Sequence, residues 1–259
     1  MQTPASPRGP ADRRAPSVGD RLSRRDVFRR IRARPEWLLH DLPPSAEELR
    51  DPVAFWRGLR LWYRLRQGSY TMLGCRRGRY LYRMAATVER RGVPGDLVDC
   101  GVWNGGSSVL LSRGAPSRRI WAFDSFEGLP EPTWRDGESS AGYAGACEGS
   151  AERVRDAFAR FAEPARLRIV KGWFADTFPQ TASEIDQVAV LHADGDWYDS
   201  VLLTLRTFHP KVVSGGYVVV DDYGHWEGAR RATEEFRDEA GVSEALVSID
   251  GNAAYWRRS

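Results

Sequence analysis

The stretch "DCGVWNGGSSVLL" at residues 99–111 has the pattern of a glycine-rich turn that joins a strand to a helix. An apolar run leads into it, and apolar residues resume after it. Gly101 permits a sharp turn, while Gly105 and Gly106 would let a ligand approach the backbone without interference from a Cβ atom. This order predicts the first unit of an α/β sheet, with a ligand beyond the carboxyl ends of its strands.

Outward from this turn, short β-rich runs alternate with helical runs. The expected strands are 96–101, 119–125, 166–172, 188–194 and 216–222, and the expected helices lie near 106–113, 150–162, 199–208 and 226–240. Alternation of this kind builds a mostly parallel sheet with helices on both faces. Two further runs, 245–250 and 253–258, would close the sheet as an antiparallel pair. We therefore expect a Rossmann-like α/β fold with seven strands.

The residues before this sheet have a different pattern. Residues 1–18 are rich in proline, alanine and arginine, a composition typical of a disordered tail. Residues 19–94 predict a helical cap or lid. It includes a long helix that starts at Ser45, where Ser45 and Glu48 have the spacing of a capping box. Residues 68–78 are expected to form a loop before the last helix of the cap, and residues 95–259 to form the ligand-binding domain.

Composition excludes several classes of protein. No apolar run approaches the roughly 18 residues that a membrane-spanning helix needs. The net charge of +3 comes from the first 35 residues, which hold ten arginines and three aspartates, so the remainder is mildly acidic and unlike a nucleic-acid-binding surface. Three cysteines without paired spacing indicate reduced thiols in a cytoplasmic protein. We expect a homo-oligomer, a dimer or larger, that acts on a small molecule.

The strand ends carry residues suited to an adenosine-type ligand. Asp99 precedes the first glycine, where a carboxylate would repel a pyrophosphate but attract an ammonium group. Asp124 ends the second strand, where an acid typically accepts hydrogen bonds from ribose hydroxyls. Trp173 and Phe174 could flank an adenine ring, with Asp176 near its polar edge. S-adenosylmethionine, which carries an amino group and no phosphate, fits this order; the alternative is a structural turn and core aromatic residues.

The stretch "LHADGDWYDS" at residues 191–200 ends a buried strand in a cluster of acids. Asp194 and Asp196 would converge with Asp221 and Asp222 if the fourth and fifth strands are neighbours. Two carboxylates about 4 Å apart repel by roughly 1–4 kcal/mol, and a divalent cation would remove that repulsion. Ligands that are all oxygen favour Mg²⁺. The alternative is that these acids are helix N-caps and surface charges.

Together these motifs resemble the macrocin O-methyltransferase family. The resemblance is carried by "LVDCGVWNGGSS", "AFDSFEGLPEP", "GWFADTFP", "ADGDWYDS" and "PKVVSGGYVVVDDYG", and it covers about residues 68–240. It implies a class I methyltransferase fold. It also implies an enzyme that uses S-adenosylmethionine and Mg²⁺ to methylate a sugar hydroxyl of a glycosylated natural product in antibiotic biosynthesis.

The resemblance further implies roles for individual residues. Asp194, Asp221 and Asp222 would hold the metal, and Asp196 would be the general base. Cofactor contacts would come from the segment "SYTMLG" and from the strand ends, at Tyr70, Thr71, Met72, Asp99, Gly101, Ser107, Asp124, Ser125, Gly172, Trp173, Phe174, Asp176 and Asp194. The acceptor would contact Trp197, Tyr198, His225 and Trp226.

Some positions depart from the family pattern. Trp197 stands where the family commonly has leucine, "HWEG" at 225–228 replaces the usual segment, and 131–149 is short and glycine-rich. These departures leave the acceptor open, and a catechol-type phenol is an alternative to a sugar. The pair Asp194 and Asp196 alone would also suit a metal-dependent glycosyltransferase, although a diphosphate beside Asp99 would be repelled. A non-catalytic binding module is a third possibility.

Overall fold

The structure is a computed structural model that describes residues 43–259. The disordered tail expected at 1–18 and the first part of the helical cap expected from residue 19 lie outside the described residues. Between residues 43 and 259, no helix is both long enough and apolar enough to cross a membrane.

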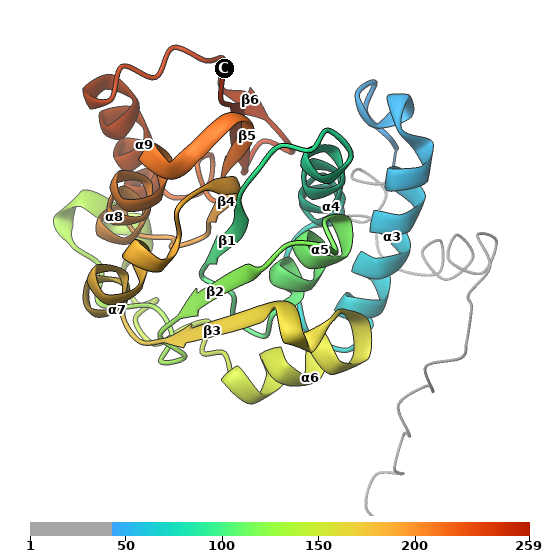
Figure 1. The fold of residues 1–259 in the computed structure, drawn as a ribbon. Helices are drawn as coiled ribbons and strands as arrows, with labels where there is room; N and C mark the ends of the chain where they lie inside the picture. Colours follow the sequence, from blue (N-terminus) through green and yellow to red (C-terminus); the bar gives the residue numbers. More distant parts are fainter. Residues whose placement is uncertain (1–42) are drawn as a thin grey trace, which may run out of the picture.

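A seven-stranded sheet forms the centre of the protein (Figure 1). Its strands are β1 (Asp96–Cys100), β2 (Ile120–Asp124), β3 (Leu167–Lys171), β4 (Val188–Ala193), β5 (Val212–Val220), β6 (Val247–Ser248) and β7 (Ala254–Arg257). The order across the sheet is β3-β2-β1-β4-β5-β7-β6, and β1 to β5 are parallel. Strand β7 is antiparallel to β5 and to β6. The predicted sheet and its closing antiparallel pair are confirmed.

Strand β5 begins at Val212 rather than at residue 216, where the sequence placed it. Val188 of β4 pairs with Val212, whereas Val190 pairs with Tyr217, so the extra residues of β5 bulge between these two pairs. Gly215 lies in this bulge with a φ of +83°. The local sequence suggests a turn, but pairing with β4 on both sides of the bulge keeps the segment in the strand.

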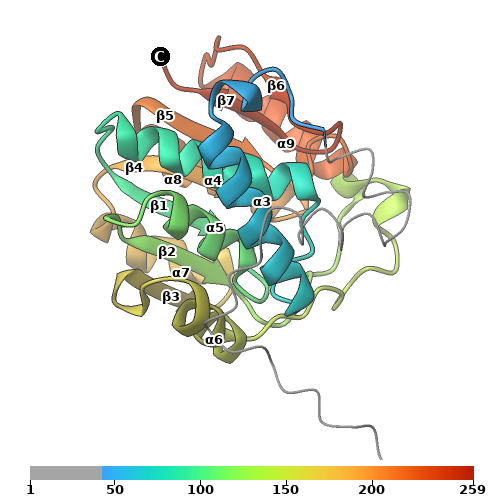
Figure 2. The ribbon, with the colours of Figure 1, turned by 90° about the vertical axis from the view of Figure 1, so that its right-hand side faces the viewer.

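Helices cover both faces of the sheet (Figures 1 and 2). On one face lie α3 (Pro52–Gln67), α4 (Cys75–Arg90), α5 (Gly106–Gly114) and α6 (Ala151–Phe161), and on the other lie α7 (Phe174–Thr181), α8 (Tyr198–Phe208) and α9 (Glu227–Glu239). Successive residues of a strand point to opposite faces. Leu97 therefore belongs to the first apolar core and Val98 to the second.

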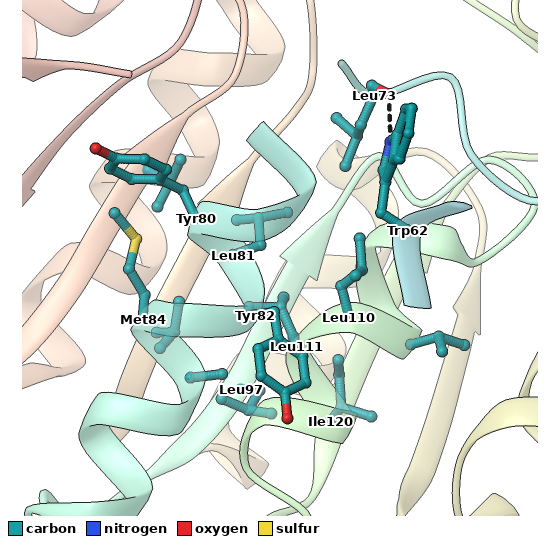
Figure 3. Packing of buried hydrophobic residues seen from close by; sticks show 14 of the residues in the cluster. Trp62, Leu73, Tyr80, Leu81, Tyr82, Met84, Leu97, Leu110, Leu111 and Ile120 are labelled. Carbon is teal, nitrogen blue, oxygen red and sulfur yellow. Dashed lines mark hydrogen bonds between the residues drawn. The ribbon is translucent and has the colours of Figure 1, made fainter. Parts of the chain in front are cut away.

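The N-terminal helices are part of the first core (Figure 3). Helix α4 approaches α3 closely because residue 78 is glycine; a Cβ atom there would lie 2.6 Å from the Trp62 ring. The Trp62 indole Nε1 donates a hydrogen bond of 2.9 Å to the carbonyl oxygen of Leu73, which fixes the segment between α3 and α4. The division of the chain at residue 94 into a cap and a catalytic domain stays a prediction.

The prediction of one long helix from Ser45 is wrong, because the structure divides this stretch into a short 3₁₀ helix and a separate α-helix. The capping box forms, since Ser45 N donates to Glu48 Oε2 at 3.0 Å and Glu48 N donates to Ser45 Oγ at 3.2 Å. It closes the turn that leads into the short 3₁₀ helix Glu48–Arg50, whose N-cap residue is Glu47. Helix α3 then starts anew, with Asp51 Oδ1 accepting from Ala54 N at 3.0 Å. Pro52 explains the break, because a proline disfavours helical geometry in the residue before it.

The first turn of α4 and the whole of α7 were not predicted as helix. Helix α4 begins at Cys75, inside the expected loop 68–78, where Gly78 interrupts the helical pattern in the sequence. Helix α7 follows β3 although no helix was expected there; it is short and contains Pro179, so its apolar spacing gives little signal.

Candidate active site

A cavity of about 240 Å³ lies at the carboxyl ends of the parallel strands. Each of the five parallel strands contributes a residue that ends it or follows it within two positions, as expected for an open α/β sheet. Segments outside the sheet cover the cavity. The residues that line the cavity include Met72, Leu73, Arg77, Gly101, Trp103, Asp124, Ser125, Gly128, Leu129, Pro130, Cys147, Trp173, Phe174, Asp194, Asp196, Asp221 and Asp222.

The glycines of the turn after β1 allow other segments of the protein to pack closely against this turn. A Cβ atom at Gly101, whose φ is +89°, would lie 1.7 Å from the carbonyl oxygen of Asp194. A Cβ atom at Gly106 would lie 2.5 Å from the carbonyl oxygen of Tyr70, to which Gly106 N donates a hydrogen bond of 2.8 Å. The expectation that Gly105 and Gly106 open the backbone to a ligand is therefore corrected. Of these glycines, Gly101 is the one that lines the cavity.

Asp99 lies beneath the cavity rather than on its wall. Its side chain is fully buried and accepts hydrogen bonds from Ser107 Oγ at 2.8 Å and Ser108 Oγ at 2.5 Å. His192 Nδ1 lies 2.7 Å from the other carboxylate oxygen. These partners tie the start of α5 to β1 and β4. Asp99 and Ser107 thus shape the turn from below, and neither is among the residues that line the cavity.

One half of the cavity has the residues expected for an adenosine. Asp124 lines it, and its carboxylate accepts from Trp103 N at 2.8 Å and from Phe126 N at 2.7 Å. These two bonds fix the plane of the carboxylate, while burial raises its pKa. Ser125 lines the cavity beside it, and Phe174 lines it while its ring stacks on Phe178 at 4.8 Å.

Of the other residues predicted to contact the cofactor, some line the cavity and some do not. Met72 and Trp173 line the cavity. Tyr70 and Thr71 are buried, and the Tyr70 hydroxyl donates to Asp156. Gly172 and Asp176 are not among the lining residues, and Asp176 is exposed on the first turn of α7.

The other half of the cavity holds the carboxylate cluster. The predicted convergence is confirmed, because β4 and β5 are neighbours and their ends meet. Ligand atoms of Asp194, Asp196 and Asp222 lie within 4.8 Å of one another, as do those of His192, Asp194 and Asp221. The donor set facing the cavity is mainly carboxylate oxygen, which suits a hard divalent cation.

Two cationic groups that were not predicted in this role contact the cluster. Arg77 at the start of α4 donates through Nη1 to Asp221 Oδ2, and its Nε lies 3.1 Å from Asp250 Oδ2. His192 Nε2 lies 3.4 Å from Asp221 Oδ1. A sequence signal existed for His192, since residues two apart on a strand share a face and Asp194 follows it at that spacing. No local pattern indicated Arg77 or Asp250.

These contacts separate the protonation behaviour of the acids. Burial and then the charge of Asp221 raise the pKa of Asp194 and of Asp222 well above the ordinary range. Burial alone would raise the pKa of Asp221, but Arg77 and His192 hold it below its ordinary value. Burial raises the pKa of Asp196 to about 6. The cluster therefore attracts cations and protons strongly.

The residues predicted to contact the acceptor lie behind the cavity. Trp197 is almost wholly buried, and its Nε1 donates to the carbonyl oxygen of Pro130 at 2.8 Å. The Tyr198 hydroxyl donates to Glu235. Trp226 Nε1 donates to Asp196 Oδ1 at 2.9 Å, and His225 is exposed with its ring against that of Trp226. None of these four lines the cavity. They were expected there because they follow the acids in sequence.

Other residues line the cavity instead. Gly128, Leu129 and Pro130 lie on the loop after β2, and Cys147 lies further along it with a φ of +60°. Burial raises the pKa of the Cys147 thiol. Both stretches were singled out in the sequence, in the motif at 122–132 and in the glycine-rich region 131–149, but no site role was predicted for these four residues.

The fold and this site define a class I methyltransferase. The model of the macrocin-O-methyltransferase (TylF) family matches residues 61–258, and the chain belongs to this family. It is therefore an S-adenosylmethionine-dependent O-methyltransferase. The glycosyltransferase and the non-catalytic module are excluded.

Individual relatives agree with this assignment. Demethyldecarbamoylnovobiocin O-methyltransferase of Streptomyces niveus is 35% identical over an alignment of 208 residues, which covers 74% of this chain and 76% of that protein. The 8-demethyl-8-(2,3-dimethoxy-alpha-L-rhamnosyl)-tetracenomycin-C 4'-O-methyltransferase of Streptomyces olivaceus is 36% identical over an alignment of 205 residues. This alignment covers 74% of this chain and 76% of that protein. The structure of the O-methyltransferase NovP superposes with a TM-score of 0.64 at 36% identity, covering 73% of this chain and 82% of that one.

Proposed function

We propose that this protein methylates a sugar hydroxyl of a glycosylated natural product, with Mg²⁺ held by Asp194, Asp221 and Asp222 and with Asp196 as the general base. The observation that carries the proposal is that Asp124 and the carboxylate cluster line one cavity. The 4'-O-methyltransferase from Streptomyces olivaceus is named for a rhamnosyl substrate, which supports a sugar acceptor.

The residues of the carboxylate cluster fit a resident cation. Burial and mutual repulsion destabilise the cluster without positive charge. Of its acids, Asp221 is the one that Arg77 contacts closely, and Asp222 Oδ1 lies 3.9 Å from Arg77 Nη1. When bound, Mg²⁺ would lower the pKa of an acceptor hydroxyl and fix its oxygen. Asp124 and Trp173 would hold the adenosine part of the cofactor. Asp196 would take the acceptor proton as the new C–O bond forms and the bond from sulfur to the methyl group breaks.

Methyl transfer to defined acceptors tests this proposal. The acceptors would be demethyldecarbamoylnovobiocin, the dimethoxyrhamnosyl tetracenomycin and their sugar-free aglycones, with labelled S-adenosylmethionine and a simple catechol as a further acceptor. We expect label on at least one glycoside, none on its aglycone, loss of transfer with a chelator and recovery with Mg²⁺. Transfer to the catechol or an aglycone without transfer to a glycoside would overturn the sugar assignment.

A further inference from the structure

The base proposed for this reaction is held by an indole. Trp226 Nε1 donates to Asp196 Oδ1 at 2.9 Å. Asp196 has a φ of +55°, in the left-handed region that residues other than glycine rarely adopt. A residue in such a conformation keeps its direction only where its surroundings fix it. The hydrogen bond from Trp226 is one such constraint, and it acts directly on the carboxylate.

Trp226 is itself held in place by neighbours from three segments. Its ring meets that of Trp197 edge to face, with centroids 5.0 Å apart, and that of Tyr143 at 5.1 Å. The Trp226 backbone N donates to the carbonyl oxygen of Asp222 at 3.0 Å, so the residue is also tied to the end of β5. Edge-to-face contacts of this kind favour one ring orientation. The indole N–H therefore has one direction, and that direction is toward Asp196.

We propose that Trp226 is a positioning residue for methyl transfer. Its N–H fixes Oδ1 and the plane of the Asp196 carboxylate, so that Oδ2 keeps one orientation toward the proton of the acceptor hydroxyl. The proposal rests on the proposed function, in which Asp196 is the base. Trp226 was expected to contact the acceptor, but its position behind Asp196 indicates that it acts through that carboxylate.

Trp226→Phe tests the proposal, because phenylalanine keeps an aromatic ring and removes the N–H. We expect kcat for methyl transfer, measured in steady-state kinetics, to fall about 10-fold. This is less than the roughly 10²- to 10⁴-fold loss expected on removing a general base. The KM for the acceptor and the affinities for cofactor and Mg²⁺ should stay within about two-fold. A kcat within about two-fold of the unaltered protein, or an equal rise in KM, would overturn the proposal.

Trp121→Phe is the matched control. The Trp121 indole also donates to a carboxylate at 2.9 Å, but its partner is Asp96, at the start of β1 and away from the cavity. Both substitutions therefore remove one indole hydrogen bond to an aspartate. Only Trp226→Phe should lower kcat, and an equal loss in both variants would mark the effect as structural.

A magnetic resonance measurement tests the hydrogen bond without methyl transfer. The ten indole N–H signals of the chain can be recorded together, and Trp226→Phe identifies the one that belongs to Trp226. Asp196→Ala should move that signal more than any other indole signal. An unmoved signal would overturn the proposal whatever the activity. A moved signal in a protein that methylates no glycoside would instead refute the proposed acceptor and leave the bond established.

Discussion

At the scale of single residues, Asp194 and Asp196 are two positions apart in sequence but have different surroundings in the cavity. Asp194 and Asp196 both line the cavity, but Asp196 has a positive φ and turns its Oδ1 to Trp226. Asp194 follows β4 directly and lies within reach of both His192 and Asp222. The geometry thus gives Asp194 more ligating neighbours and gives Asp196 a donor of its own.

We predict that Asp194→Asn loses Mg²⁺ affinity and activity together. Asp196→Asn should still bind Mg²⁺ and cofactor but transfer methyl about 10²- to 10⁴-fold more slowly, because only the proton acceptor is missing. Calorimetric titration beside single-turnover kinetics distinguishes the two variants. If Asp196→Asn lost Mg²⁺ affinity as fully as Asp194→Asn does, Asp196 would be a ligand and the base would lie elsewhere.

A second prediction concerns His192. Burial alone would lower the pKa of His192, yet its hydrogen bonds to Asp221 and Asp99 raise it from 6.5 to about 9. A pKa that is higher in the folded state stabilises the protein fully below pH 6.5 and stops doing so as the pH rises through about 9. With metal chelated, the free energy of unfolding should fall over this range by up to about 3 kcal/mol relative to His192→Gln. Denaturant curves that change in parallel for both proteins would contradict this.

At the scale of elements, the site depends on the close approach of the ends of β1 and β4. Asp194 N donates to the carbonyl oxygen of Cys100 at 2.9 Å, and the Asp194 backbone passes over Gly101 with no room for a Cβ atom. The turn after β1 therefore sets the position of a predicted metal ligand that is far from it in sequence.

Gly101→Ala should consequently damage both stability and metal binding. The matched control is Gly142→Ala, whose φ of +85° resembles that of Gly101 but where nothing lies within 4 Å of the added Cβ atom. The control should cost about 1–2 kcal/mol for the positive φ alone. Gly101→Ala should cost clearly more and weaken Mg²⁺ affinity by displacing Asp194, as measured by denaturation and calorimetry. Equal effects of the two substitutions would refute the steric explanation.

At the scale of the whole molecule, charge is unevenly distributed along the chain. The first 35 residues are strongly basic and the remainder is mildly acidic. A homo-oligomeric state and a cytoplasmic location stay predictions. Light scattering on the purified chain, whose mass is 29.2 kDa, measures the first of these.

Deleting residues 1–18 should leave turnover within about three-fold of the full chain. The composition of this tail cannot bury a core, so the folded site should form without it. Steady-state kinetics of the truncated and full-length proteins provide the measurement. Complete loss of turnover would show that the tail contributes to a site, and light scattering would then show whether an oligomer is lost with it.

The sequence by itself determined the order of the strands and of most helices, the glycine-rich turn, and the four acids at the strand ends. These are local signals, because the spacing of apolar residues and the residue type at a strand end can be recognised within a few consecutive residues. Parallel strands end at one edge of the sheet, so the sequence also placed Asp194 and Asp221 at that edge. That they meet there was decided by the pairing of β4 with β5.

Only the tertiary structure decided which groups complete the site. Arg77 meets Asp221 across 144 residues, because helix α4 lies on the sheet with its first turn at the strand ends. Asp99 is withdrawn from the cavity by Ser107, Ser108 and His192, and Trp226 faces Asp196 rather than an acceptor. Such contacts depend on how whole elements pack against one another, and the local sequence around these residues does not indicate that packing.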